Sequence, residues 1–193
     1  MRIGIDIDDT MTFIKDDLLK AACEYDKRLG NSGVPLNDDY YIGKRFNWTK
    51  EEYHYFMGEV RKKVVMNAKI RNGLIEILTK LRQMGHKIII ITARTNYYYK
   101  DSHGMTIEWL KKEQIPYDKL ILGSINKKKD CINEKIEIFL DDDINNCLSV
   151  YDCGIKTFIM DNNDNYLDNS DIIRVYDFYD FYEKIENILK KSK

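Results

Sequence analysis

Three aspartates lie close together near the start of the chain, in the run Gly4-Ile5-Asp6-Ile7-Asp8-Asp9-Thr10. Isoleucines at positions 3, 5 and 7 make this run resemble a buried strand, and buried strands rarely contain carboxylates without a partner. Because alternate side chains of a strand point the same way, we expect Asp6 and Asp8 to share a face. Two such carboxylates repel each other unless a positive charge, most simply a divalent metal ion, lies between them. A metal site is therefore favoured over an acidic turn that only caps a helix.

Polar residues also follow three later apolar segments. They are Thr92-Ala93-Arg94, Lys127-Lys128-Lys129 and Asp141-Asp142-Asp143. Ligands of open α/β sheets bind beyond the carboxyl ends of the strands, so we expect these residues to meet the first acidic run there. Acids, a hydroxyl, an arginine and lysines would together hold a divalent cation and a phosphoryl group.

Strand-like and helix-like segments alternate along most of the chain. Strands are predicted at about 2–7, 87–92, 119–122, 136–140 and 157–160, and helices at about 15–29, 73–85, 101–113, 128–134, 144–152 and 178–190. This alternation predicts an α/β fold with a doubly wound, Rossmann-like parallel sheet. Residues 12–70 contain no convincing core strand. We therefore expect a core formed by 1–11 and 71–193, with 12–70 inserted after the first strand as a helical cap.

The composition excludes several classes of protein. The 193 residues are 44% hydrophobic and 33% charged, with a net charge of -1, which is typical of a globular protein and not of a nucleic-acid-polymer binder. We expect no signal peptide and no membrane span, because the chain enters a strand at once and lacks a long apolar run. The four cysteines form no CxxC pair, so reduced thiols and a cytoplasmic location are expected. The oligomeric state is left open.

The ordered polar tips resemble the four motifs of the haloacid dehalogenase (HAD) superfamily, phosphatases that use an aspartate nucleophile. The run from Asp6 to Thr10 matches the first motif, DxDxT, and Thr92 matches the second. One lysine of 127–129 matches the third, and Asp141-Asp142 matches the acidic-pair form of the fourth. The resemblance covers essentially the whole chain and implies an HAD-like core.

Three further segments narrow the resemblance within the superfamily. Ile91-Thr92-Ala93-Arg94, Trp109-Leu110-Lys111-Lys112 and Ile115-Pro116-Tyr117 are most similar to bacterial nucleotidases grouped with the cytosolic 5'(3')-deoxyribonucleotidases. Those proteins carry a helical cap between motifs one and two, and this chain has its insertion in that interval.

The resemblance implies a role for each acid of the site. Asp6 would attack phosphorus and become an aspartyl phosphate, while Asp8 would act as the general acid and base. Mg²⁺ would bind a carboxylate oxygen of Asp6, the backbone carbonyl of Asp8, and Asp142. Asp141 would either bind the metal or hold a metal-bound water, and Asp143 is expected to cap a helix.

The phosphate-binding residues implied by the resemblance come from two segments. The tip Thr92-Ala93-Arg94 would contact the phosphoryl oxygens through the hydroxyl of Thr92, while Arg94 would clamp phosphate or, equally, pair with an acid of the site. A lysine would neutralise charge on the same oxygens. Among the three candidates we favour Lys128, with Lys127 as the close alternative.

The cap is expected to select the substrate, because the four motifs treat all phosphate monoesters alike. Phe46, Trp48 and nearby tyrosines in the aromatic segment 38–66 would stack on a nucleobase, and Phe13 would line the same pocket. Alternatively, the aromatic residues of the insertion would build the core of the cap itself. The predicted function is a Mg²⁺-dependent 5'(3')-nucleotidase that acts on (deoxy)ribonucleoside monophosphates. The alternatives are a phosphatase of sugar phosphates or other small metabolites and, third, a non-catalytic phosphate-binding module.

Overall fold

The computed structural model describes residues 1–39, 41–162, 165 and 171–191. Its core is a six-stranded parallel sheet with the order β5-β4-β1-β6-β7-β8. The strands are β1 (Arg2–Ile5), β4 (Lys87–Ile91), β5 (Lys119–Ile121), β6 (Ile138–Asp141), β7 (Lys156–Met160) and β8 (Ile173–Val175). The predicted α/β fold with a doubly wound parallel sheet is confirmed.

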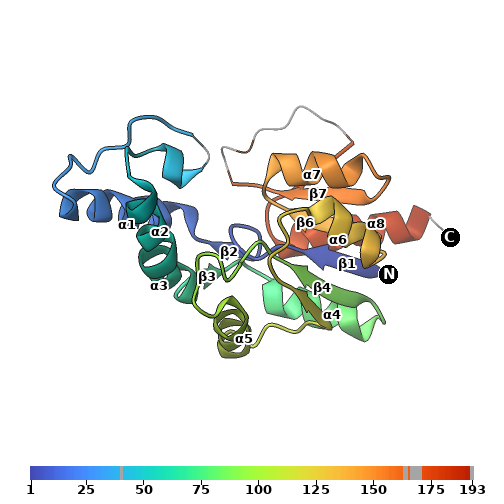
Figure 1. Cartoon of the computed structure of the whole chain (residues 1–193). Coiled ribbons are helices and arrows are strands. Elements are labelled where there is room, and N and C mark those ends of the chain that lie inside the picture. The colour runs from blue at the N-terminus through green and yellow to red at the C-terminus, as the bar shows by residue number, and fades with distance from the viewer. Residues whose placement is uncertain (40, 163–164, 166–170, 192–193) are drawn as a thin grey trace.

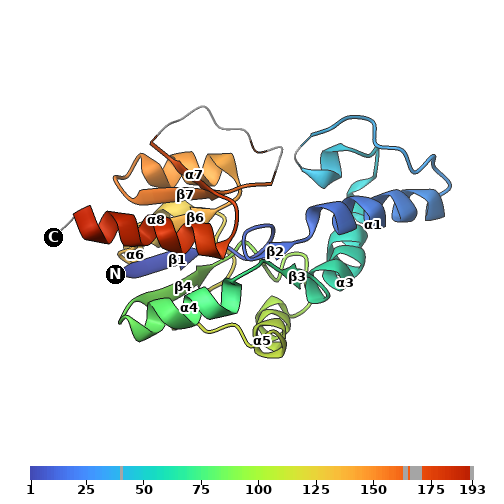
Figure 2. The ribbon, with the colours of Figure 1, turned by 180° about the vertical axis from the view of Figure 1, so that it is seen from behind.

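Helices cover both faces of this sheet (Figures 1 and 2). The helices of the core are α4 (Leu74–Gln83), α5 (Ser102–Lys112), α6 (Lys127–Asn133), α7 (Ile144–Tyr151) and α8 (Phe178–Lys191). Residues of α4, α5 and α8 pack with Ile88 and Ile90 on one face, and residues of α6 and α7 pack with Ile89 and Ile91 on the other. The unbroken run of isoleucines in β4 is thus explained, because each face of the strand has its own apolar layer.

Most of the predicted strand and helix boundaries lie within two or three residues of the observed ones. Two differences are informative. Strand β1 ends at Ile5 and not at 7, because the chain turns there and Asp9 adopts a left-handed backbone conformation with φ of 60°. Strand β8 was not predicted. It is a three-residue edge strand beside β7, too short to show a period. Residues 163, 164 and 166–170 of the polar segment before it lie outside the described residues.

The segment between β1 and α4 is helical and lies beyond the carboxyl ends of the strands (Figure 1). It contains β2 (Thr12–Phe13), α1 (Lys15–Arg28), η1 (Ile42–Lys44), α2 (Lys50–Tyr55), the π-helical turn η2 (Phe56–Val60), α3 (Arg61–Met66) and β3 (Lys69–Ile70). Strands β2 and β3 pair antiparallel, so the two chain crossings between cap and core run side by side. The exact division into core and cap at residues 12 and 70 stays a prediction.

The cap is built from ordinary local signals and a small apolar core. Thr49 begins α2 with a capping box, in which its hydroxyl accepts from the amide of Glu52 and the carboxylate of Glu52 accepts from the amide of Thr49. Ala22, Tyr25, Phe46 and Phe56 form the buried cluster of the cap, and Trp48 packs against it. Within the described residues, no helix is both long and apolar enough to cross a bilayer.

Candidate active site

The sheet brings Asp6 and Asp141 together at the ends of neighbouring strands. The amide of Asp6 donates a 3.0 Å hydrogen bond to the carbonyl of Leu140, which extends the β1–β6 pairing by one step. From the start of α6, the ammonium group of Lys127 donates to a carboxylate oxygen of Asp6 and to the carbonyl of Ile91. The same ammonium lies 3.8 Å from Asp141 Oδ2. A buried lysine therefore bridges the carboxyl ends of three strands.

Asp6, Asp141 and Asp142 form a buried carboxylate cluster. Each offers an oxygen within 4.8 Å of the others. Burial raises the pKa of all three, and a neighbouring carboxylate adds to this for Asp141, whose pKa rises to about 7, and for Asp142. Three buried acids beside one lysine leave an excess of negative charge, which a divalent cation would relieve. The all-oxygen donor set fits Mg²⁺.

Hydrogen bonds hold the two acids of the fourth motif in place. Thr10 Oγ1 donates to Asp142 Oδ1 at 2.8 Å, and Asn162 Nδ2 donates to Asp142 Oδ2 at 3.2 Å. Asp141 accepts from the amide of Asp143 at 2.9 Å and from Asn146 Nδ2 at 3.2 Å. Such supporting bonds orient carboxylates that would otherwise turn away from a metal.

Asp8 is held by two guanidinium groups from different parts of the molecule. Arg94, just after β4, places Nη2 at 2.6 Å from Asp8 Oδ1 and Nε at 3.4 Å from Oδ2. Arg61, the first residue of α3, places Nη2 at 2.7 Å from Oδ2. Burial alone would raise the pKa of Asp8, but the two arginines outweigh it and hold this pKa well below its usual range. Asp8 is therefore ionised in this arrangement.

Asp9 has a structural role. Its Oδ1 accepts from the amides of Ile14 and Lys15, at 2.9 and 3.0 Å, and so binds the N-terminus of α1. Its carbonyl accepts from Arg71 Nη2 at 2.8 Å. The third aspartate of the opening run thus fixes how the cap leaves the core.

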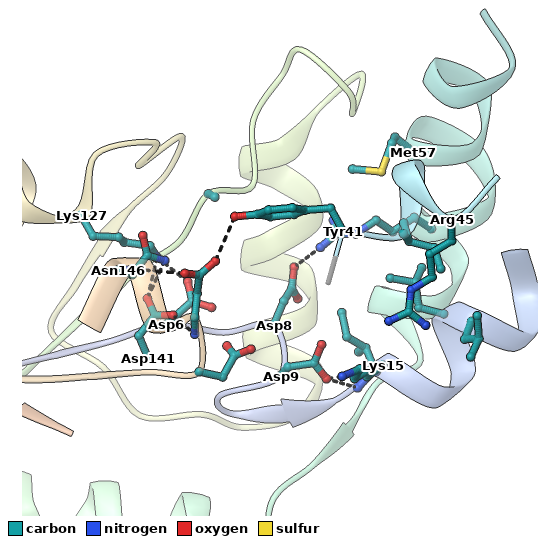
Figure 3. Close-up of a pocket in the computed structure, with 18 of the residues that line it drawn as sticks. Asp6, Asp8, Asp9, Lys15, Tyr41, Arg45, Met57, Lys127, Asp141 and Asn146 are labelled. Carbon is teal, nitrogen blue, oxygen red and sulfur yellow. Dashed lines mark hydrogen bonds and ion pairs between the residues drawn. The ribbon is translucent and has the colours of Figure 1, made fainter. Parts of the chain in front are cut away.

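A cavity of about 270 Å³ lies between the acids and the cap. Figure 3 shows Asp6, Lys127 and Asp141 at its core end, with Arg45 and Met57 coming from the cap. A second cavity of about 200 Å³ shares Asp6, Asp8 and Arg61 with the first and adds Thr92 and Arg94. Asp6, Lys127 and the carboxylate cluster therefore face a cavity large enough for a small ligand.

Comparison with known proteins shows the family to which this chain belongs. Residues 3–192 match the family described as 5' nucleotidase, deoxy (pyrimidine), cytosolic type C protein. The chain belongs to this family. It is 31% identical over 155 residues to a nucleotidase of Clostridium acetobutylicum, and the alignment covers 79% of this chain and 78% of that protein. The chain is accordingly a phosphoric monoester hydrolase, as the four motifs predicted.

Solved structures of HAD-type proteins have the same fold as this member of the nucleotidase family. A haloacid dehalogenase-like hydrolase from Streptococcus pneumoniae matches with a TM-score of 0.68 and 15% identity over 97% of both chains. YfnB of Bacillus subtilis, an HAD-type protein solved with bound magnesium, matches with a TM-score of 0.62 and 12% identity over 96% of this chain and 98% of that one. The predicted HAD-like fold is confirmed.

Most of the predicted site residues meet at the sheet edge, but the lysine that joins them is Lys127 and not the favoured Lys128. Helix α6 begins at Lys127, one residue earlier than predicted, because Asn126 caps it through the amide of Lys129. Lys127 is therefore turned inward to Asp6, and Lys128 is exposed. Arg94 pairs with Asp8, which was one of its two expected roles. Asp143 caps α7, as predicted.

The aromatic residues expected to line the substrate pocket lie elsewhere. Phe46 and Trp48 stack on each other with ring centroids 4.7 Å apart inside the apolar cluster of the cap. Phe13 is half exposed and lies under the guanidinium of Arg71, away from the cavity. The alternative of a structural role is thus correct for Phe46 and Trp48. Among the described residues, Tyr41 and Tyr53 are the aromatic side chains that line the first cavity.

The two cap arginines that reach the site were not predicted from the sequence. Arg45 and Arg61 line the cavity although no motif includes them. Local spacing could not reveal Arg61, because the π-helical turn before it changes the face on which it lies. The aromatic content of 38–66 indicated the right segment, and Tyr53 is one of its tyrosines, but it did not identify the arginines.

Proposed function

We propose that the chain is a Mg²⁺-dependent nucleotidase that dephosphorylates (deoxy)ribonucleoside monophosphates through an aspartyl phosphate on Asp6. The observation that carries this proposal is the meeting of Asp6, Lys127, Asp141 and Asp142 at the floor of one cavity. The proposal takes further support from the family to which the chain belongs and from the nucleotidase name of the Clostridium acetobutylicum relative.

In the first step, a carboxylate oxygen of Asp6 forms a bond to phosphorus while the bond from phosphorus to the leaving oxygen breaks. Asp8, two residues further along, gives the leaving oxygen a proton. In the second step, Asp8 takes a proton from a water molecule that attacks the same phosphorus, which releases phosphate and regenerates Asp6. Lys127 stabilises the charge on the transferring phosphoryl oxygens, and Thr92 donates its hydroxyl to them.

Asp6, Asp141, Asp142 and the backbone carbonyl of Asp8 would hold the Mg²⁺ ion. When bound, it neutralises the carboxylate cluster and polarises the phosphoryl group. The pairing of Asp8 with Arg61 and Arg94 corresponds to the ionised form, which is the form that accepts a proton from water. The acid form is needed when substrate is bound, and a phosphoryl dianion beside Asp8 favours protonation by like-charge repulsion.

The nucleoside part of the substrate would occupy the cap end of the cavity, where Tyr41 and Tyr53 offer aromatic contact surfaces. The nucleotidase assignment, together with free thiols at all four cysteines, also supports action in the cytoplasm on a small-molecule phosphate monoester.

A panel of phosphate monoesters tests this proposal. With Mg²⁺ present, we expect deoxyribonucleoside and ribonucleoside monophosphates to be hydrolysed with higher kcat/KM than sugar phosphates, and chelation of the metal to abolish turnover. Asp6→Asn should lower kcat by at least a thousandfold, whereas Asp16→Asn, a change at an exposed position of α1, should leave it unchanged. A consistent preference for sugar phosphates would overturn the substrate assignment, and full turnover by Asp6→Asn would overturn the nucleophile.

A further inference from the structure

Asp8 is the point at which the cap makes direct contact with the proposed catalytic residues. Its carboxylate lies between Arg94, which belongs to the core, and Arg61, which belongs to the cap. The side chains of Arg61 and Asp8 are 16% and 14% exposed, so water screens this ion pair poorly. Movement of the cap away from the core would leave Asp8 with the core arginine alone.

Arg61 reaches Asp8 because the helix before it contains a π-helical turn. Helix α2 and helix α3 are joined through η2, and Arg61 is the first residue after that turn. One extra residue in a turn rotates everything after it by roughly 100° about the helix axis. A regular α-helix through the same residues would therefore aim Arg61 along a different direction.

The same turn lies close to the core. A Cβ atom on Gly58 would lie 2.7 Å from the carbonyl oxygen of Tyr98, so only glycine allows this approach. The next residue of that core loop, Tyr99, is buried among Ile14, Val65 and Met105, a cluster that joins cap and core. The hydroxyl of Tyr99 accepts a hydrogen bond from Arg61 Nη1. The guanidinium is thus held at both ends, by Tyr99 and by Asp8.

Arg61 also lies on the wall shared by the two cavities, together with Asp6 and Asp8. A salt bridge that served only to hold the cap would not need to be made with this carboxylate. We propose that Arg61 is a positioning residue, through which closure of the cap orients the Asp8 carboxylate for proton transfer. The proposal rests on the role of Asp8 given under Proposed function, and it couples the chemistry to the closed position of the cap.

The dependence on the leaving group tests this role. Protonation of the leaving oxygen matters for an alkoxide, as in a nucleoside monophosphate, and matters little for p-nitrophenyl phosphate, whose leaving group departs as a stable anion. The ratio kcat/KM includes only the steps up to departure of the leaving group, so it reports this proton transfer without the later hydrolysis. A change that weakened substrate binding but kept the contact between Arg61 and Asp8 would lower kcat/KM for both substrates by similar factors.

We expect Arg61→Met to lower kcat/KM at least tenfold more for a nucleoside monophosphate than for p-nitrophenyl phosphate. Arg61→Lys should restore part of the difference, and the exposed neighbour variant Lys62→Met should show none. Adding Arg61→Met to Asp8→Asn should cause no further selective loss, because the residue would act through Asp8. Thermal unfolding of each variant identifies failure to fold. If Arg61→Met does not fold, Gly58→Ala takes its place, because its Cβ would force the turn before Arg61 away from the carbonyl of Tyr98.

Equal losses on the two substrates, or full additivity with Asp8→Asn, would overturn the positioning role of Arg61 while leaving the proposed function intact. Absence of any selective loss in Asp8→Asn itself would instead overturn the role of Asp8. If the unaltered protein hydrolyses no nucleotide, the proposed substrate fails, and the comparison is made with the alkyl phosphate that it hydrolyses best.

Discussion

The hydroxyl of Thr10 donates a 2.8 Å hydrogen bond to a carboxylate oxygen of Asp142, across 132 residues of sequence. Both residues are buried, and the bond joins the end of the first acidic run to Asp142, the residue directly after β6. The last residue of the DxDxT motif thus serves the proposed metal site by fixing the direction of a ligand.

Loss of this hydroxyl should weaken metal binding without changing the ligands themselves. We expect Thr10→Val to raise the Mg²⁺ concentration that gives half-maximal activity by about ten- to a hundredfold, because supporting bonds of this kind have effects of that size. Thr10→Ser keeps the hydroxyl and should lie close to the unaltered protein. Identical Mg²⁺ titrations of Thr10→Val and Thr10→Ser would contradict this prediction.

Two adjacent lysines offer a matched test of the third motif. Lys127 contacts Asp6 and is buried, whereas Lys128 is exposed on the same helix. We expect Lys127→Met to lower kcat by about a hundred- to a thousandfold, the usual effect of removing one group that stabilises transition-state charge. Lys128→Met should retain nearly full kcat. Steady-state rates at saturating Mg²⁺ measure both, and a larger loss in Lys128→Met would show that the wrong lysine has been assigned.

The stability of the metal-free protein should depend on pH through the buried acids. Burial raises the pKa of Asp141 from 3.8 to about 7 and raises that of Asp142 as well, so the folded state binds protons more tightly than the unfolded state. The free energy of unfolding of the chelated protein should therefore fall as pH rises from about 4 toward 7. Bound Mg²⁺ holds these acids in their ionised form and should remove most of this fall.

Denaturant unfolding at several pH values, in chelator and in Mg²⁺, measures this difference. Other titrating groups contribute to both series, so the comparison isolates the carboxylate cluster. In chelator, Asp142→Asn should show a shallower pH dependence than the unaltered protein. Parallel pH profiles with and without Mg²⁺ would argue against a metal at these acids.

The aromatic residues of the cap should separate into two kinds. Tyr53 lines the cavity, so Tyr53→Ala should raise KM for a nucleoside monophosphate several-fold with a small change in the melting temperature. Trp48 packs in the cluster of the cap and donates a 2.8 Å hydrogen bond to Asp26, so Trp48→Ala should cost on the order of 2 kcal/mol of stability. Steady-state kinetics and thermal unfolding of both variants check this. A raised KM in Trp48→Ala together with lost stability in Tyr53→Ala would show that Trp48, and not Tyr53, lines the substrate pocket.

Local signals in the sequence carried the prediction of the fold. The strand predicted at about 87–92 matches β4, and Asp143, expected to cap a helix, caps α7. Strand β8 was not predicted, because three residues at a sheet edge are too few to show an alternating pattern. Its pairing with β7 is set by tertiary contact alone.

The residues able to do the chemistry could be predicted from the sequence, because parallel strands bring their carboxyl ends to one edge wherever the segments between them form helices. Asp6, Asp141 and Asp142 were therefore expected to lie together, and they do. The lysine that turns inward depends on the folded structure, since a one-residue shift in the start of α6 rotates each side chain by about 100°. The tertiary structure also decided that Arg61 meets Asp8, 53 residues away, because a π-helical turn and the docking of the cap set that direction.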